Sequence, residues 1–155
     1  MKRLRDLVRT LVEQTLFERI ISEEIPANFI ARGDDWSAFL DVFPRRPGHT
    51  LVVPHLPVMR LIDLPINNLA SLMKGVQITQ RKLKKYFGNE DFSVVLHDGP
   101  IAGQEIHHLH FHVIPRQKDD GGQTLLSMWP ETKQSSQPDF AGLASLCSAI
   151  GGANK

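Results

Sequence analysis

The sequence has little cysteine, almost no excess of charge and no long apolar run. Its 155 residues include one cysteine, Cys147, which cannot form an internal disulfide and suits a reducing cytosol. The 18 basic and 17 acidic side chains give a net charge of +1, which argues against nucleic-acid binding as the main role. No apolar run approaches the roughly 20 residues that a membrane helix needs, and charged residues interrupt the N-terminal segment where a signal peptide would be apolar. We therefore expect a cytoplasmic protein that binds neither nucleic acid nor a membrane.

The residues that are present describe an ordinary globular domain. Hydrophobic residues make up 41% and charged residues 23% of the chain, which excludes disordered and fibrous proteins. A length near 150 residues suits a single domain. We expect that domain over residues 16–116, an amphipathic helix over 1–15, and a tail with a short helix over 117–155. The helix over 1–15 rests on apolar residues at helical spacing, and a helix lying on a membrane surface is the alternative for it.

Local patterns predict five strands and one long helix. Strands are expected over residues 28–32, 36–42, 50–53, 92–97 and 106–115. Helices are expected over residues 16–22, 66–87 and 140–150. The basic residues at 81, 82, 84 and 85 should form a solvated face of the long helix, with nucleic-acid contact as the weaker interpretation. Few strands, one long helix between them and no repeated βαβ unit predict an α+β fold with a mainly antiparallel five-stranded sheet, one long helix and terminal helices.

Histidine is concentrated in one short stretch. Five of the seven histidines lie within residues 97–112. Because strand side chains alternate between faces, His108, His110 and His112 should share one accessible face while the apolar residues between them line the core. A structural role is the usual explanation for a single histidine. Three in register, near His49 and His97, favour a functional role, because adjacent imidazoles repel one another when charged.

A row of imidazoles can bind a metal ion or a phosphate chain. The outer two histidines of the row are about 13 Å apart at their Cα atoms, so all three cannot share one ion. Two neighbours could still chelate zinc, with His49 or a carboxylate completing the site. An extended row suits a longer anion, and the central His110 is the best placed to attack a phosphoryl group as a neutral nucleophile. The glycine-containing turn at 98–104 exposes backbone N–H groups and would form a second wall of a phosphate site.

The segment that contains this row resembles a known family. Residues 103–116, GQEIHHLHFHVIPR, are similar to the signature of the histidine triad family of nucleotide hydrolases and transferases, and further similar motifs lie at 17–27, 39–41 and 47–54. The resemblance covers about residues 16–116. It implies an α+β fold, a homodimer, a purine nucleotide as substrate and no required cofactor, although a divalent cation can accompany the substrate phosphates.

The resemblance also implies a role for each matching residue. His110 would be the nucleophile that attacks the α-phosphate and forms a nucleotidyl-histidine intermediate, which water then hydrolyses. The phosphate-binding residues would be His108, His112, His49, Gln104 and His97. Asp41 would accept hydrogen bonds from the ribose hydroxyls. Phe17, Ile20 and Phe39 would form an apolar slot for the base, with ordinary core packing as the alternative for these three. No residue is expected to bind a metal ion.

The sequence departs from the family pattern at three places. His97 stands where the family usually has asparagine or glutamine, and its charge would vary with pH. Glu105 stands where several members have a serine or threonine that donates to the leaving group, which a carboxylate cannot do unless it is protonated. The cysteine pair that binds structural zinc in some members is missing from residues 16–19.

Two further segments bear on the substrate. The surroundings of Asp98-Gly99-Pro100 and Pro115-Arg116 resemble the dinucleoside polyphosphate hydrolases, and Arg116 could meet an outer phosphate unless it simply faces solvent. Met128-Trp129-Pro130 resembles the C-terminal segment of the phosphoramidase branch. We therefore expect a hydrolase of nucleotide phosphoanhydrides, of the dinucleoside polyphosphate type. Hydrolysis of purine nucleoside phosphoramidates, or nucleotide binding with little turnover, are the alternatives.

Overall fold

The computed structural model describes residues 13–121, 128–129 and 137–150, and the chain divides into two units, residues 1–120 and 121–155. The helix expected within residues 1–15 lies almost entirely outside the described residues. In the part of the chain that is described, no helix is both long enough and apolar enough to cross a membrane.

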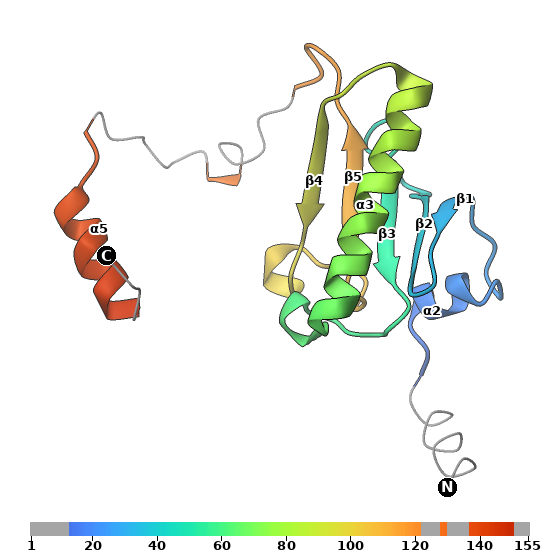
Figure 1. Cartoon of the computed structure of the whole chain (residues 1–155), viewed down its shortest axis with the longest axis horizontal. Coiled ribbons are helices and arrows are strands. Elements are labelled where there is room, and N and C mark those ends of the chain that lie inside the picture. Colours follow the sequence, from blue (N-terminus) through green and yellow to red (C-terminus); the bar gives the residue numbers. More distant parts are fainter. Residues whose placement is uncertain (1–12, 122–127, 130–136, 151–155) are drawn as a thin grey trace, which may run out of the picture. The chain divides into compact units, whose positions relative to one another are not determined.

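The first unit is built on a five-stranded antiparallel sheet (Figure 1). Its strands are β1 (Phe29–Arg32), β2 (Trp36–Leu40), β3 (Thr50–Pro54), β4 (Phe92–Leu96) and β5 (Phe111–Pro115). Their order across the sheet is β1-β2-β3-β5-β4, and every neighbouring pair is antiparallel. The expected α+β fold is confirmed.

The described part of the chain contains three α-helices. They are α2 (Leu16–Ile21), α3 (Ile66–Phe87) and α5 (Phe140–Ile150). Figure 1 shows α3 running along one face of the sheet. Its inward-facing residues are buried at Leu72, Val76 and Leu83, and it ends at Gly88, whose φ of 72° is the left-handed conformation that glycine adopts without strain. The bounds expected for α3 and α5 are confirmed.

Trp36 lies at the centre of the core beneath α3. Its side chain is 4% exposed, in a cluster with Ala38, Val52 and Leu72. A Cβ atom added to Gly75 would lie 2.6 Å from the indole ring, closer than real Cβ atoms approach. Because Gly75 has no side chain, the backbone of α3 can pack directly against the indole ring.

A second apolar cluster lies on the opposite face of the sheet. It contains Phe17 and Ile20 from α2, packed against Phe39, Leu51 and Val53. The two clusters separate because β2 and β3 alternate their side chains between the faces. Phe17, Ile20 and Phe39 are only 2–8% exposed, so in this structure they are core residues and offer little surface to a nucleotide base. The slot expected from these three side chains is therefore not open.

The strand expected over 106–115 begins only at Phe111. Before that point the backbone bonds locally: the N–H of His108 donates to the Ile106 carbonyl (2.8 Å) and the N–H of Leu109 donates to the Val58 carbonyl (2.7 Å). The ladder with β3 pairs Val52 with Phe111 and goes no further. Two of the three histidines thus precede the strand instead of lying on it.

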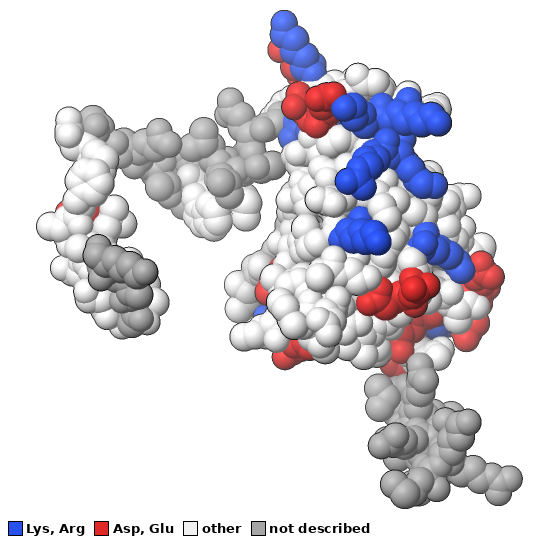
Figure 2. Space-filling view, viewed as in Figure 1, with Lys and Arg blue, Asp and Glu red and all other residues white. Residues whose placement is uncertain are grey.

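The basic residues of α3 lie on its outer face. Lys74, Arg81, Lys82, Lys84 and Lys85 are all exposed, and Figure 2 shows lysine and arginine side chains spread over this side of the molecule. Lys84 forms an ion pair with Glu90. The others have the solvent exposure expected of a hydrated helix face.

The second unit contains α5. Its N-terminus is capped by Asp139, whose carboxylate accepts from the N–H of Gly142 (2.9 Å) and whose carbonyl accepts from the N–H of Leu143 (3.0 Å). Phe140, Leu143 and Ile150 are exposed on this helix. Met128 and Trp129, which precede it, are also exposed.

Candidate active site

Five side chains from four parts of the chain meet beside β3 and β5. Asp41 follows β2, His49 precedes β3, and His97 follows β4. His110 immediately precedes β5, and His112 lies within it. The pairing of Leu51 with His112 brings the start of β3 beside the histidine row. The ring of His112 lies 4.9 Å from that of His110, 5.1 Å from that of His49 and 5.4 Å from that of His97.

The orientation of His110 is set by the backbone before it. Its Nδ1 lies 2.7 Å from the carbonyl oxygen of His108. A carbonyl can only accept, so Nδ1 carries the proton and Nε2 of the neutral ring carries the lone pair. Phe17 packs edge-on against the same ring, with centroids 5.0 Å apart, and His110 is 6% exposed. The ring of His110 is thus held in one orientation with its Nε2 lone pair free, but it is buried and does not lie on the open face expected from the sequence.

His49 and His112 form a directed pair of hydrogen bonds. The backbone N–H of Arg45 donates to Nδ1 of His49 (3.1 Å), so Nε2 of His49 must carry the proton. That Nε2 lies 2.9 Å from Nδ1 of His112, to which it donates. The remaining nitrogen of His112, Nε2, therefore carries an N–H group. Asp41 supports the pair, with Oδ2 3.6 Å from Nε2 of His49 and Oδ1 accepting from the N–H of Phe43 (2.9 Å).

His108 has protein partners at both ring nitrogens. Its Nε2 donates to the carbonyl of Pro54 (2.8 Å), and its Nδ1 accepts from the hydroxyl of Thr15 (2.8 Å). The side chain is 0% exposed. The phosphate contact expected of His108 has no ring atom left to make it, and the residue instead fixes the backbone whose carbonyl orients His110.

Thr15 was not identified from the sequence as part of the site. It caps α2: its hydroxyl accepts from the N–H of Glu18 (3.1 Å), and Glu18 accepts from the N–H of Thr15 (2.8 Å). The available signal is the Thr-x-x-Glu pattern of a capping box, three residues apart just before an apolar run. That pattern predicts the cap but not the contact with His108.

We expect Thr15→Val to lower the free energy of unfolding by about 2 kcal/mol. Valine has the shape of threonine but lacks the hydroxyl, so the helix loses its cap and the buried Nδ1 of His108 loses its donor. Urea unfolding monitored by circular dichroism measures the change. Thr15→Ser keeps the hydroxyl and is the matched control; equal losses in both variants would contradict the assignment.

His97 and Gln104 lie in the segment that connects β4 to β5. Nδ1 of His97 lies 2.7 Å from the carbonyl of Ala102. The amide of Gln104 donates to the Met59 carbonyl (2.8 Å), while its buried Oε1 has no hydrogen-bond partner. The second N–H of its amide is the one left for the donation to phosphate expected of Gln104.

Four of the site histidines have lowered pKa values, which favour the neutral ring. Burial lowers the pKa of His49, His108 and His110 below the usual 6.5. Burial, and next the neighbouring His110 and His49, lower the pKa of His112 to about 4. Neutral rings supply both the lone pair of His110 and the uncharged N–H of His112 near pH 7.

These lowered pKa values make stability depend on pH. Below about pH 6.5 the unfolded chain binds protons at these imidazoles while the folded chain does not, so the free energy of unfolding falls with pH until about pH 4, where His112 also protonates in the fold. Urea unfolding between pH 5 and 7, above most carboxylate titration, checks this. His112→Asn should show a shallower slope in that window, and a wild-type stability independent of pH there would refute the neutral row.

Metal ligation can be tested against the hydrogen bonds. Asp41, His49 and His112 are the one group of three among the described residues whose ligand atoms converge, all within 4.8 Å of one another. A metal-bound imidazole normally donates its other N–H to an acceptor. In His49 the other nitrogen, Nδ1, instead accepts from a backbone N–H. A metal on Nε2 would require that bond to break, so the arrangement suits an anion more than zinc.

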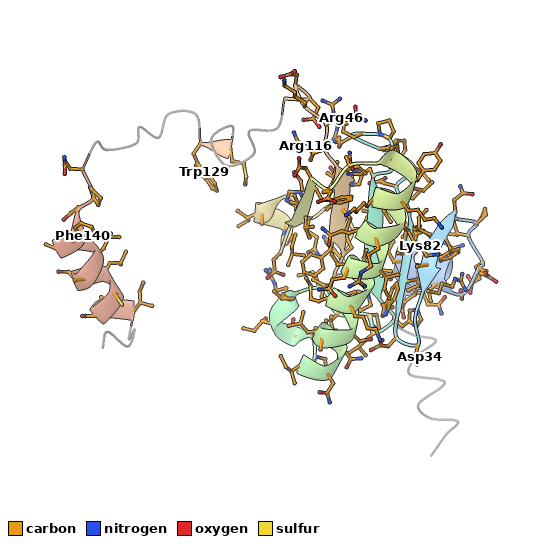
Figure 3. The ribbon with its side chains drawn as sticks, turned by 45° about the horizontal axis from the view of Figure 1, so that its top comes forward. Asp34, Arg46, Lys82, Arg116, Trp129 and Phe140 are labelled. Atoms are coloured by element: carbon orange, nitrogen blue, oxygen red, sulfur yellow. The ribbon has the colours of Figure 1, made fainter. Side chains whose placement is uncertain are left out.

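Arg116 does not reach the histidine row with a free guanidinium. It forms an ion pair with Asp120 and donates to the hydroxyl of Ser93 (2.9 Å). Arg46 also donates to the carbonyl of Asp120, and Figure 3 shows Arg46 and Arg116 close together at one end of the sheet. The outer-phosphate contact expected of Arg116 is therefore replaced by an internal ion pair.

Comparison with known proteins places this geometry in a family. The HIT domain model matches residues 22–119. An uncharacterized HIT-like protein of Methanocaldococcus jannaschii is 43% identical over 68% of this chain and 81% of its own. An adenosine 5′-monophosphoramidase of Saccharomyces cerevisiae is 32% identical over 88% of this chain and 80% of its own. An asymmetrical bis(5′-nucleosyl)-tetraphosphatase of Schizosaccharomyces pombe is 39% identical over 54% of this chain and 46% of its own.

A solved structure also shares the fold. A crystal structure of a Streptococcus mutans protein superposes with a TM-score of 0.78 at 26% identity, covering 90% of this chain and 85% of the other. The range matched by the family model includes the whole histidine row and Asp41. The chain therefore belongs to the HIT domain family.

Proposed function

We propose that the protein hydrolyses nucleotides at the α-phosphate through a covalent intermediate on His110. The observation that carries this proposal is the bond from Nδ1 of His110 to the His108 carbonyl (2.7 Å), which leaves the lone pair on Nε2. In the first step Nε2 forms a bond to the α-phosphorus and the leaving group departs. In the second, water forms a bond to phosphorus, the P–N bond breaks, and a nucleoside monophosphate is released.

The surrounding groups have roles that follow from their hydrogen bonds. The N–H on Nε2 of His112, directed outward by the donation from His49, can bind a phosphate oxygen as charge develops on it. Asp41 keeps a carboxylate oxygen beside this pair and is the group proposed to accept from the ribose. His108 positions His110 through its own backbone carbonyl.

The leaving group defines the substrate class. Phosphoanhydrides of the dinucleoside polyphosphate type are the first candidate, because a relative is a tetraphosphatase and the exposed Arg45 lies close enough to lower the pKa of His49 by its charge. Nucleoside phosphoramidates are the second candidate, because Arg116 is engaged by Asp120 and so does not serve an outer phosphate. A phosphoramidate has no outer phosphate to bind.

The test compares the rates on two substrates and looks for the covalent adenylyl intermediate. Release of AMP from diadenosine tetraphosphate and from adenosine 5′-phosphoramidate gives kcat/KM for each class. The protein is denatured rapidly at alkaline pH, where a P–N bond to histidine is stable, and chromatography with mass spectrometry should then find one adenylyl group on the peptide containing His110. A protein that binds AMP but turns over neither substrate faster than its His110→Gly variant would be a binding module, and the proposal would fail.

Several expectations from the sequence remain predictions. They are a homodimer, a purine base, a cytoplasmic location, and catalysis without a required cofactor. Size-exclusion chromatography with light scattering tests the first of these.

A further inference from the structure

We infer that His97 exchanges the proton of the reaction, giving it to the leaving group in the first step and taking it from water in the second. This inference rests on the proposed function. It identifies a catalytic residue that the hydrogen bonds single out among the imidazoles of the site.

The ring of His97 is fixed from two sides. Its Nδ1 bonds to the Ala102 carbonyl (2.7 Å). A Cβ atom added to Gly103 would lie 3.2 Å from the same Nδ1, so the loop closes directly on the ring at a residue without a side chain. On its other side the ring meets His112 edge-on, with an interplanar angle of 72°. The charge of His97 also acts on both His110 and His112, which places it within the reacting group of imidazoles.

The bond to Ala102 decides which nitrogen can exchange a proton. The carbonyl only accepts, so Nδ1 keeps its proton in both charge states of the ring. Nε2 carries a proton only when the ring is charged. Within the described residues no hydrogen bond occupies Nε2 of His97, so a proton can enter and leave there without breaking a contact in the protein.

The other imidazoles cannot do this. Both ring nitrogens of His49 and of His108 are occupied by protein partners. His112 presents an N–H, but its Nδ1 is occupied as an acceptor, and loss of the Nε2 proton would leave an imidazolate. His110 supplies the attacking lone pair. Besides His110, which is proposed to use its free nitrogen for the attack, His97 is the ring among these that combines a fixed position with a free nitrogen.

The proton balance closes over the two steps. The charged ring of His97 transfers its Nε2 proton to the leaving oxygen or nitrogen as the bond to phosphorus breaks and the bond to Nε2 of His110 forms. The now neutral Nε2 of His97 then takes a proton from the attacking water as the P–N bond breaks. His97 ends the cycle charged, as it began, and one group serves as acid and then as base.

The test separates proton exchange from positioning. In His97→Asn the amide nitrogen is bonded to Cγ, as Nδ1 is in histidine. The amide can therefore still donate to the Ala102 carbonyl, but it has no proton to exchange with the leaving group or with water. Adenosine 5′-(N-butyl)phosphoramidate has a poor leaving group that needs a proton, whereas adenosine 5′-(p-nitrophenyl phosphate) has a good one that does not. His107→Asn is the matched control, because His107 is exposed and adjacent to the row in sequence.

The two substrates should respond differently. With the phosphoramidate, we expect His97→Asn to lower kcat by about 10²-fold. With the nitrophenyl ester, the first turnover should slow by less than about three-fold and release a burst of p-nitrophenol equal to the enzyme, followed by a steady state slowed by about 10²-fold. His107→Asn should match the wild type on both substrates.

Failure of this inference and of the proposed function look different. If His97→Asn slowed both substrates and the burst equally, His97 would be a positioning residue. If His97→Asn kept the wild-type rates, His97 would have no role in the reaction. Either result overturns the inference. A wild type that shows no burst and no adenylyl group on His110 would overturn the proposed function itself.

Discussion

His110→Ala is expected to lower kcat by about 10⁴-fold on every nucleotide that the wild type hydrolyses. Alanine removes the ring proposed to supply the attacking lone pair, whose other nitrogen is held by the 2.7 Å bond to the carbonyl of His108. His49 and His108 cannot substitute, because both ring nitrogens of each are engaged. Removing the nucleophile of a covalent mechanism costs more than removing any single phosphate contact. Initial rates with the better of the two substrates measure the loss.

The control for this variant is His107→Ala, an exposed histidine whose loss should leave turnover within about two-fold of the wild type. Binding of AMP, measured by calorimetry, should persist in His110→Ala and so separate lost chemistry from lost folding. A loss of ten-fold or less would mean that water attacks phosphorus directly and that no covalent intermediate is needed.

Trp36→Ala is expected to lower the free energy of unfolding by about 3–5 kcal/mol. The indole is 4% exposed, and α3 approaches it at Gly75, where an added Cβ would lie 2.6 Å from the ring. Truncation leaves a cavity between the helix and the sheet that neither can fill without moving. Urea unfolding curves give the value.

Tyr86→Ala is the matched control, since Tyr86 is an aromatic residue on α3 with 83% exposure. We expect a loss below about 0.5 kcal/mol for it. A Trp36→Ala variant as stable as Tyr86→Ala would contradict the central place of the indole in the core.

The elements whose bounds depend on neighbouring residues could be predicted from the sequence. The long helix keeps its expected bounds because its apolar period, Pro65 before it and Gly88 after it all act locally. The strand before Pro115 was predicted too long because periodicity does not reveal where pairing stops. There the N–H of Leu109 finds the carbonyl of Val58, a contact across about fifty residues.

The sequence predicted which histidines come together, but not their burial or the directions of their hydrogen bonds. His49, His97, His110 and His112 do meet, as expected from the spacing and the family resemblance. The direction of each hydrogen bond depends on backbone groups that carry no residue-specific signal, such as the His108 carbonyl. Burial of the row follows from packing against α2, which strand alternation cannot show.

The N–H of Arg45 has a consequence for sequence variation. It sets the direction of donation through His49 and His112 toward the ligand, yet it is a peptide group, which nineteen of the twenty amino acids provide. Proline alone lacks it. For this hydrogen bond, position 45 is therefore constrained by one forbidden residue and not by a required one.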